Sequence, residues 1–158
     1  MKRQLFLIFF SLSFICVFSQ ETYKIKYDTK KLEGTWVAIS GNKSYEITFF
    51  RKILYYNEVK ANYEKVVGSI KYFENNKLIK YVETNGDLPP LRVYDRIAPN
   101  YSIHYTEKEN NKEIFGIVNF DINPDGKTAR WYLLRTRPIL VSTKEKFDIP
   151  KELTFTKK

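Results

Sequence analysis

The chain has 158 residues, 43% of them hydrophobic and 16% aromatic, and its 27 Lys and Arg outnumber its 18 Asp and Glu to give a net charge of +9. This apolar content excludes a disordered chain, and one Cys with six Gly and six Pro excludes a disulfide-rich or collagen-like scaffold. The length fits a single domain, and the composition by itself selects no chemistry.

The first element is an export signal. Lys2 and Arg3 precede an apolar run over residues 5–18, which is shorter than the roughly 20 residues that a membrane-spanning helix needs. Small residues stand just before the expected cleavage point. We therefore expect residues 1–19 to be a cleaved signal peptide and residues 20–158 to form one domain in the periplasm or outside the cell.

Cleavage removes Lys2, Arg3 and Cys16, which leaves 139 residues and lowers the net charge from +9 to +7. Lipid attachment at Cys16 is the alternative use of this segment. Phe14 and Ile15 precede this Cys, and both are bulky where a lipoprotein needs a small residue. A lipoprotein is therefore not expected, and the mature chain lacks thiol chemistry.

Short runs of β-branched and aromatic residues, separated by Gly, Asn, Asp and Pro, indicate strands joined by hairpins. The predicted strands are 34–40, 44–50, 52–58, 65–74, 77–84, 91–96, 101–107, 112–122, 129–137 and 152–157. Residues 28–33 are expected to form a single turn, and residues 57–65 a helix or a loop. The fold class is all-β, a single antiparallel up-and-down barrel of about 8–10 strands, with a sandwich as the other β architecture.

Alternation with a period of two assigns inner and outer faces to these strands. It places Tyr45, Tyr72, Tyr105 and Phe120 on inner faces, where they either line a cavity or pack as a plain core. His104 falls on an outer face.

Gly34-Thr35-Trp36 opens the first long strand. It resembles the Gly-x-Trp signature of lipocalins and related barrels, in which the Gly allows close backbone approach and the Trp plugs the closed end. The resemblance implies a lipocalin-like barrel closed by Gly34 and Trp36. The chain departs from true lipocalins because it has no Cys pair, and because the Arg that should stack on the Trp is not identifiable among Arg130, Arg135 and Arg137.

Further motifs look like a family of small secreted, lipocalin-like Bacteroidota proteins of unknown function. They are Gly68-x-Ile70-x-Tyr72, Trp131-x-Leu133 and the segment Phe147 to Lys157, which contains Ile149-Pro150-Lys151-Glu152-Leu153-Thr154. With Leu32 to Trp36, the similarity spans roughly Leu32 to Lys157. It implies a fold and a compartment and no ligand.

Neither a metal nor a cofactor site is expected. Residues 121–126 match the first half of a calcium loop, but Tyr132 takes the twelfth position, so a hairpin turn is the better interpretation. His104 has no second ligand nearby in the sequence. The alternation assigns no Asp or Glu to an inner face, so an enzyme is not expected, although a carboxylate-dependent hydrolase stays an alternative.

The sequence thus favours an exported, non-enzymatic binding module that holds a small apolar ligand in a pocket lined by Tyr45, Tyr72, Tyr105 and Phe120. The alternative is a protein-interaction or structural domain of the cell envelope without a ligand cavity. No nucleic-acid partner is expected. The scattered basic surplus predicts at most weak contact with an anionic envelope surface, and the sequence does not determine the oligomeric state.

Overall fold

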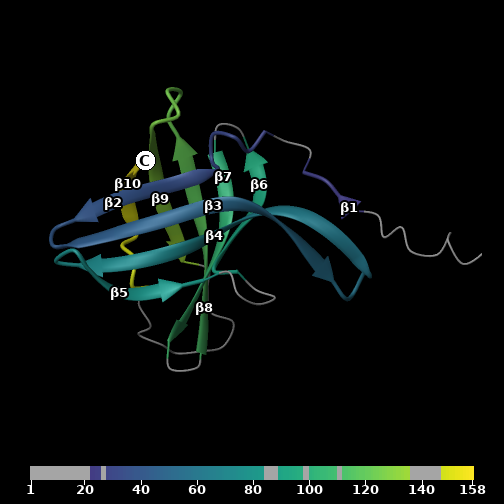
Figure 1. Ribbon diagram of the computed structural model, residues 1–158, viewed down its shortest axis with the longest axis horizontal. Coiled ribbons are helices and arrows are strands. Elements are labelled where there is room, and N and C mark those ends of the chain that lie inside the picture. Colours follow the sequence, from purple (N-terminus) through teal and green to yellow (C-terminus); the bar gives the residue numbers. More distant parts are fainter. Residues whose placement is uncertain (1–21, 26–27, 84–88, 98–99, 110–111, 136–146) are drawn as a thin grey trace, which may run out of the picture.

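The computed structural model describes residues 22–25, 28–83, 89–97, 100–109, 112–135 and 147–158, and the regular elements in these ranges are all β-strands (Figure 1). The strands are β1 (Thr22–Tyr23), β2 (Gly34–Ser40), β3 (Lys43–Tyr56), β4 (Ala61–Glu74), β5 (Lys77–Val82), β6 (Leu91–Ile97), β7 (Asn100–Glu109), β8 (Lys112–Ile122), β9 (Thr128–Arg135) and β10 (Glu152–Lys157).

Eight strands form a closed antiparallel barrel in the order β4-β3-β2-β10-β9-β8-β7-β6, with β4 and β6 pairing to close it. Nearly every strand lies beside its neighbour in sequence, so the barrel is of the up-and-down type. The closing contact is short and pairs Val67 with Arg92 and Gly68 with Leu91. β5 and the parallel strand β1 pair with other parts of the same edge of β4. The predicted all-β barrel is confirmed.

The prediction of two strands at 44–50 and 52–58 is wrong, because β3 runs without a break and every residue in it has a partner in β4. A turn over residues 57–60 joins the two strands, and residues 61–65 already belong to β4, not to a helix or loop. The two long strands continue beyond the barrel as a twisted ribbon (Figure 1). We call residues 51–65 the β3–β4 arm.

Large rings fill the described interior. Phe120 makes an edge contact with Trp36, with ring centroids 5.2 Å apart, and a tilted contact with Phe155 at 5.9 Å. Phe155 in turn lies 6.0 Å from Trp131, whose ring makes an edge contact with Tyr105 at 5.6 Å. These rings are fully or almost fully buried, and edge-to-face contacts of this kind add to the stabilisation from burial.

Gly68 allows Phe49 and Leu91 to pack closely against the backbone of β4. A Cβ atom at this position would lie 2.9 Å from Phe49 Cδ1 and 3.2 Å from Leu91 Cδ1. We expect Gly68→Ala to lower the free energy of unfolding by about 1–3 kcal/mol through overpacking. Urea denaturation measures this change. Ser69→Ala, on the outer face of the same strand, is the control and is expected to change it by about 0.5 kcal/mol or less. Equal effects of the two substitutions would contradict this packing.

Candidate functional site

The segment before β2 packs against the barrel, with Leu32 fully buried in its core. The predicted turn at residues 28–33 is confirmed, with Leu32 N and Glu33 N both donating to Thr29 O. Tyr101 on β7 donates from its hydroxyl to Asp28 O at 3.1 Å, which ties the turn to the far wall. We call residues 28–33 the strap.

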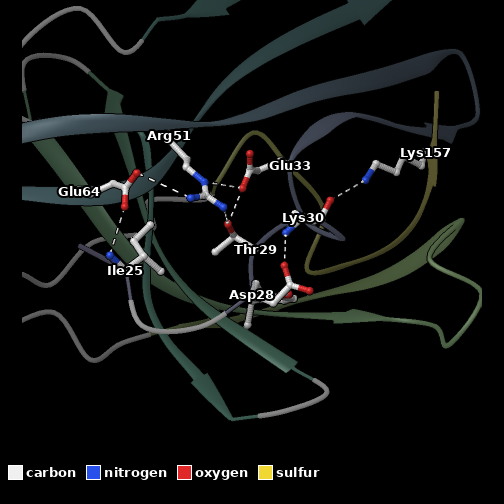
Figure 2. Close-up of polar contacts among 9 residues, drawn as sticks. Ile25, Asp28, Thr29, Lys30, Glu33, Arg51, Glu64 and Lys157 are labelled. Atoms are coloured by element: carbon white, nitrogen blue, oxygen red, sulfur yellow. Dashed lines mark hydrogen bonds and ion pairs between the residues drawn. The ribbon is translucent and has the colours of Figure 1, made fainter.

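Figure 2 shows how polar contacts hold the strap against the β3–β4 arm. Arg51 Nε donates to Glu33 Oε1 at 2.8 Å, and Arg51 Nη2 donates to Thr29 Oγ1 at 2.9 Å. Glu64 accepts from Ile25 N at 3.2 Å and pairs with Arg51 at 3.7 Å. Burial opposes ionisation of Glu33, but hydrogen bonds from Thr29 and Arg51 outweigh it and keep the pKa of this carboxyl below its ordinary value.

Gly34 and Trp36, expected to close the barrel, both lie at the strap. Trp36 is fully buried, and its Nε1 donates to Leu32 O at 2.7 Å. Gly34 has φ of +112°, a conformation that favours glycine, and a Cβ there would lie 3.2 Å from Lys157 Cε. The cation over the Trp36 ring is Lys157, with Nζ 5.2 Å from the centroid, and this Nζ also donates to Lys31 O at 2.8 Å.

Of the three arginines proposed for that place, Arg130 is the one whose side chain the structure describes, and it does not lie there. Arg130 points to the surface, where it pairs with Glu152 at 3.1 Å. The side chain of Arg135, and Arg137 altogether, lie outside the described residues. A lysine from the last strand supplies the charge because strand β10 pairs with β2 directly beside Trp36.

The structure separates the four residues predicted to line a pocket. Tyr72 joins Tyr45 by a ring contact at 5.8 Å and Tyr105 by a hydrogen bond between hydroxyls at 2.7 Å. Phe120 instead packs on Trp36 beside the strap. All four expose 3% or less of their surface, so side chains occupy the described space around them. Their role in holding a ligand stays a prediction.

Glu107 is a buried residue that the sequence reasoning missed. It is only 2% exposed and follows Tyr101, Ile103 and Tyr105 on the inner face of β7. The expectation that no Asp or Glu lies on an inner face is therefore wrong. The sequence contained a signal for this burial, because the inner-face alternation of this strand continues from Tyr105 to Glu107, two residues further along.

Glu107 is surrounded by donors. Its Oε1 accepts from Lys80 Nζ at 2.9 Å and from the Tyr72 hydroxyl at 3.2 Å, while its Oε2 accepts from Asp148 N at 2.9 Å. Lys80 also pairs with the carboxylate of Asp148 at 2.5 Å. The two carboxylates thus face each other across one ammonium group. Only Glu107 is buried, since the side chains of Lys80 and Asp148 are 32% and 55% exposed. We call Glu107, Lys80 and Asp148 the buried ion cluster, after Glu107.

Burial sets the protonation preferences in this cluster. It raises the pKa of Glu107 above the ordinary value, although Lys80 and the Asp148 N–H oppose the shift. Asp148 shifts in the other direction, because hydrogen bonds from Lys80 and Glu107 outweigh burial and lower its pKa. Burial likewise raises the pKa of Tyr72 and Tyr105 far above the ordinary range, so both hydroxyls stay neutral.

A groove of about 480 Å³ lies on the outside of the barrel. The β3–β4 arm contributes Tyr56, Val59, Tyr63 and Lys65. The neighbouring strands β6 and β7 contribute Arg92, Val93, Tyr94 and His104. We call this the outer groove. It was not foreseen, because residues 57–65 were not recognised as the point where one long strand turns into the next.

Ring contacts fix the walls of the outer groove. Tyr94 stacks on His104 with centroids 4.8 Å apart and planes 11° from parallel, so the prediction that His104 faces outward is confirmed. Tyr63 stacks on Tyr23 at 4.7 Å and meets the edge of Tyr56 at 5.2 Å. Burial and the charge of Arg92 on the paired strand lower the pKa of His104, which keeps this ring neutral at pH 7.

The calcium-loop motif forms the predicted hairpin turn between β8 and β9. Asn123 N donates to Thr128 O and Gly126 N donates to Asn123 O, each at 2.9 Å. Asp125 accepts from Lys127 N at 2.9 Å. Among the described residues, no three His, Cys, Asp or Glu side chains gather as a metal would require.

The described strands define a closed antiparallel up-and-down β-barrel, an architecture consistent with lipocalin-like proteins. The chain belongs to DUF6705, a family of unknown function whose model matches residues 1–88. That match includes the Gly-x-Trp strand but not the C-terminal motif.

No curated protein and no solved structure matches this chain. The part of the chain that the structure describes contains no helix long and apolar enough to cross a membrane.

The buried ion cluster gives a pH-dependent prediction. Lys80→Met removes a charged hydrogen bond from Glu107, so we expect the free energy of unfolding to fall by about 1.5–3 kcal/mol at about pH 8. The raised pKa of Glu107 gives stability that is present at low pH and lost as pH rises. The lowered pKa of Asp148 gives stability lost as pH falls.

Without Lys80, the ionised carboxylates of Glu107 and Asp148 lose their cation, which destabilises the fold most at high pH. The difference in the free energy of unfolding between Lys80→Met and wild type should therefore shrink at about pH 4. Urea denaturation at the two pH values measures it. The control is Lys80→Met combined with Glu107→Gln, which removes the buried charge and should recover most of the loss. A difference that does not depend on pH would contradict this account of the cluster.

Proposed function

We propose that this protein is an exported, non-enzymatic binding barrel that takes a small, mostly apolar ligand in its outer groove. One observation carries the proposal: a groove of about 480 Å³ with three tyrosines in its lining opens on the surface of a barrel whose described interior is filled by side chains. This volume lies within the range of about 300–1,000 Å³ that small-molecule sites commonly have.

Burial of the inner tyrosines favours the outer groove over the interior. Tyr45, Tyr72 and Tyr105 already contact one another or the buried ion cluster, so a ligand among them would have to displace buried groups that are already paired. Tyr94, in contrast, is 68% exposed and is held in place by His104. Rigid, accessible tyrosines bind apolar molecules at a low cost in conformational entropy.

The arrangement of carboxylates supports a non-enzymatic role. A carboxylate-dependent hydrolase needs an acid and a base that both reach the substrate. Glu107 and Asp148 do face each other, but Lys80 stands between them and Glu107 is buried. The proposal of export rests on the basic and apolar pattern of residues 1–19.

A second function is favoured by a different surface. Ile53 and Tyr55 lie on the face of the β3–β4 arm opposite to the groove residues Tyr56 and Tyr63, and both are exposed. Exposed apolar side chains on a projecting ribbon suit contact with a protein of the cell envelope. This would make the barrel an interaction domain whose arm meets the partner.

The uncharged dye N-phenyl-1-naphthylamine tests the first function. We expect saturable binding, seen as a rise in dye fluorescence, and dissociation about tenfold weaker in Tyr94→Ser, because one wall of the groove is lost. Tyr81→Ser removes an exposed tyrosine of β5 outside the groove and should leave the affinity unchanged. Failure of the wild-type protein to bind the dye, or equal binding by Tyr94→Ser, would overturn the proposal.

A further inference from the structure

The charges that line the outer groove all have the same sign. Lys65 and Arg92 are cationic, and none of the eight lining residues is acidic. Within the described part of the chain, neither side chain forms an ion pair, and Nε of Arg92 is buried without a hydrogen-bond acceptor. A buried donor left without a partner is costly, so this wall of the groove is short of a negative group.

We propose that the outer groove selects a flat aromatic molecule that carries an anionic group, with the ring against Tyr63 and Tyr94 and the anion beside Arg92 and Lys65. This inference rests on the proposed function and adds the chemical class of the ligand. It is distinct from a general attraction of the basic surface for anions, because it requires rings and charge at the same place.

The aromatic part of the inference follows from how the two tyrosines are held. Tyr94 is fixed by its stack on His104, and Tyr63 is fixed between Tyr23 and Tyr56. These side chains lose little freedom when a ligand arrives, which favours stacking of a rigid ring over wrapping of a flexible chain.

The anionic part follows from where the cations lie relative to those rings. Lys65 Nζ is 5.8 Å from the centroid of the Tyr63 ring. Arg92 pairs across the sheet with His104, on which Tyr94 stacks. An aromatic ring between the two tyrosines would therefore bring its substituent close to one or both cations. Burial lowers the pKa of His104, and the positive charge of Arg92 beside it lowers this pKa further.

A matched pair of dyes tests the inference. 8-Anilinonaphthalene-1-sulfonate and N-phenyl-1-naphthylamine share the same ring system, and only the first carries a sulfonate. We expect the sulfonate dye to bind about tenfold more tightly at low salt and to lose this advantage as salt increases. Chemical-shift changes of the imidazole protons of His104, the one His in the chain, report whether each dye is in the groove.

Variants then assign the charge preference to named residues. Arg92→Gln and Lys65→Gln should each weaken the sulfonate dye about threefold to fivefold while the uncharged dye stays within about twofold. Lys127→Gln, in the β8–β9 turn, is the control that removes the same charge away from the groove and should change neither dye. Thermal denaturation of each variant shows that the fold is retained.

The outcomes separate the two proposals. Equal binding of the two dyes to the wild type, or unchanged sulfonate binding in both Arg92→Gln and Lys65→Gln, would overturn the anion preference and leave the groove as an apolar site. Equal weakening in Lys127→Gln would attribute the preference to overall charge and would likewise overturn it. Binding of neither dye would remove the proposed function itself.

Discussion

Phe120 lies against Trp36, Phe49 and Phe155, and these four buried rings fill the interior beside the strap. Because the rings are buried and in contact, edge to face between Phe120 and both Trp36 and Phe49 and tilted between Phe120 and Phe155, the half of the interior beside the strap is a packed core. The other half contains Tyr72, Tyr105 and Glu107, whose polar atoms bond to one another or to Lys80. Because side chains fill the described interior, the accessible tyrosines lie on the outside of the barrel.

The β3–β4 arm supplies one wall of the outer groove. β3 and β4 stay paired along their whole length, so the ribbon continues beyond the residues that close the barrel (Figure 1). Arg51 anchors the start of the arm to the strap through Glu33 and Thr29 (Figure 2). The strand that carries Arg51 also carries Tyr56, so β3 contacts the strap and lines the outer groove.

Much of the fold could be predicted from the sequence, because hairpin turns and period-two alternation are local signals. The alternation correctly placed Tyr45, Tyr105 and Phe120 inside and His104 outside. The sequence pattern wrongly predicted a strand break at Arg51, because a charged residue there interrupts an apolar run. The strand continues, since Arg51 has partners in β4 and in the strap. Lys157 over Trp36 could not be predicted, because strand order around the barrel determines that contact.

The central claim is that ligand binding occurs outside a filled barrel. Amide and side-chain NMR shifts recorded while N-phenyl-1-naphthylamine is added to the labelled protein test it most directly. The account predicts that the largest changes fall on Tyr63, Tyr94 and His104. Changes concentrated instead on Tyr45, Tyr72, Tyr105 and Phe120 would show that the ligand enters the interior, and would contradict the account.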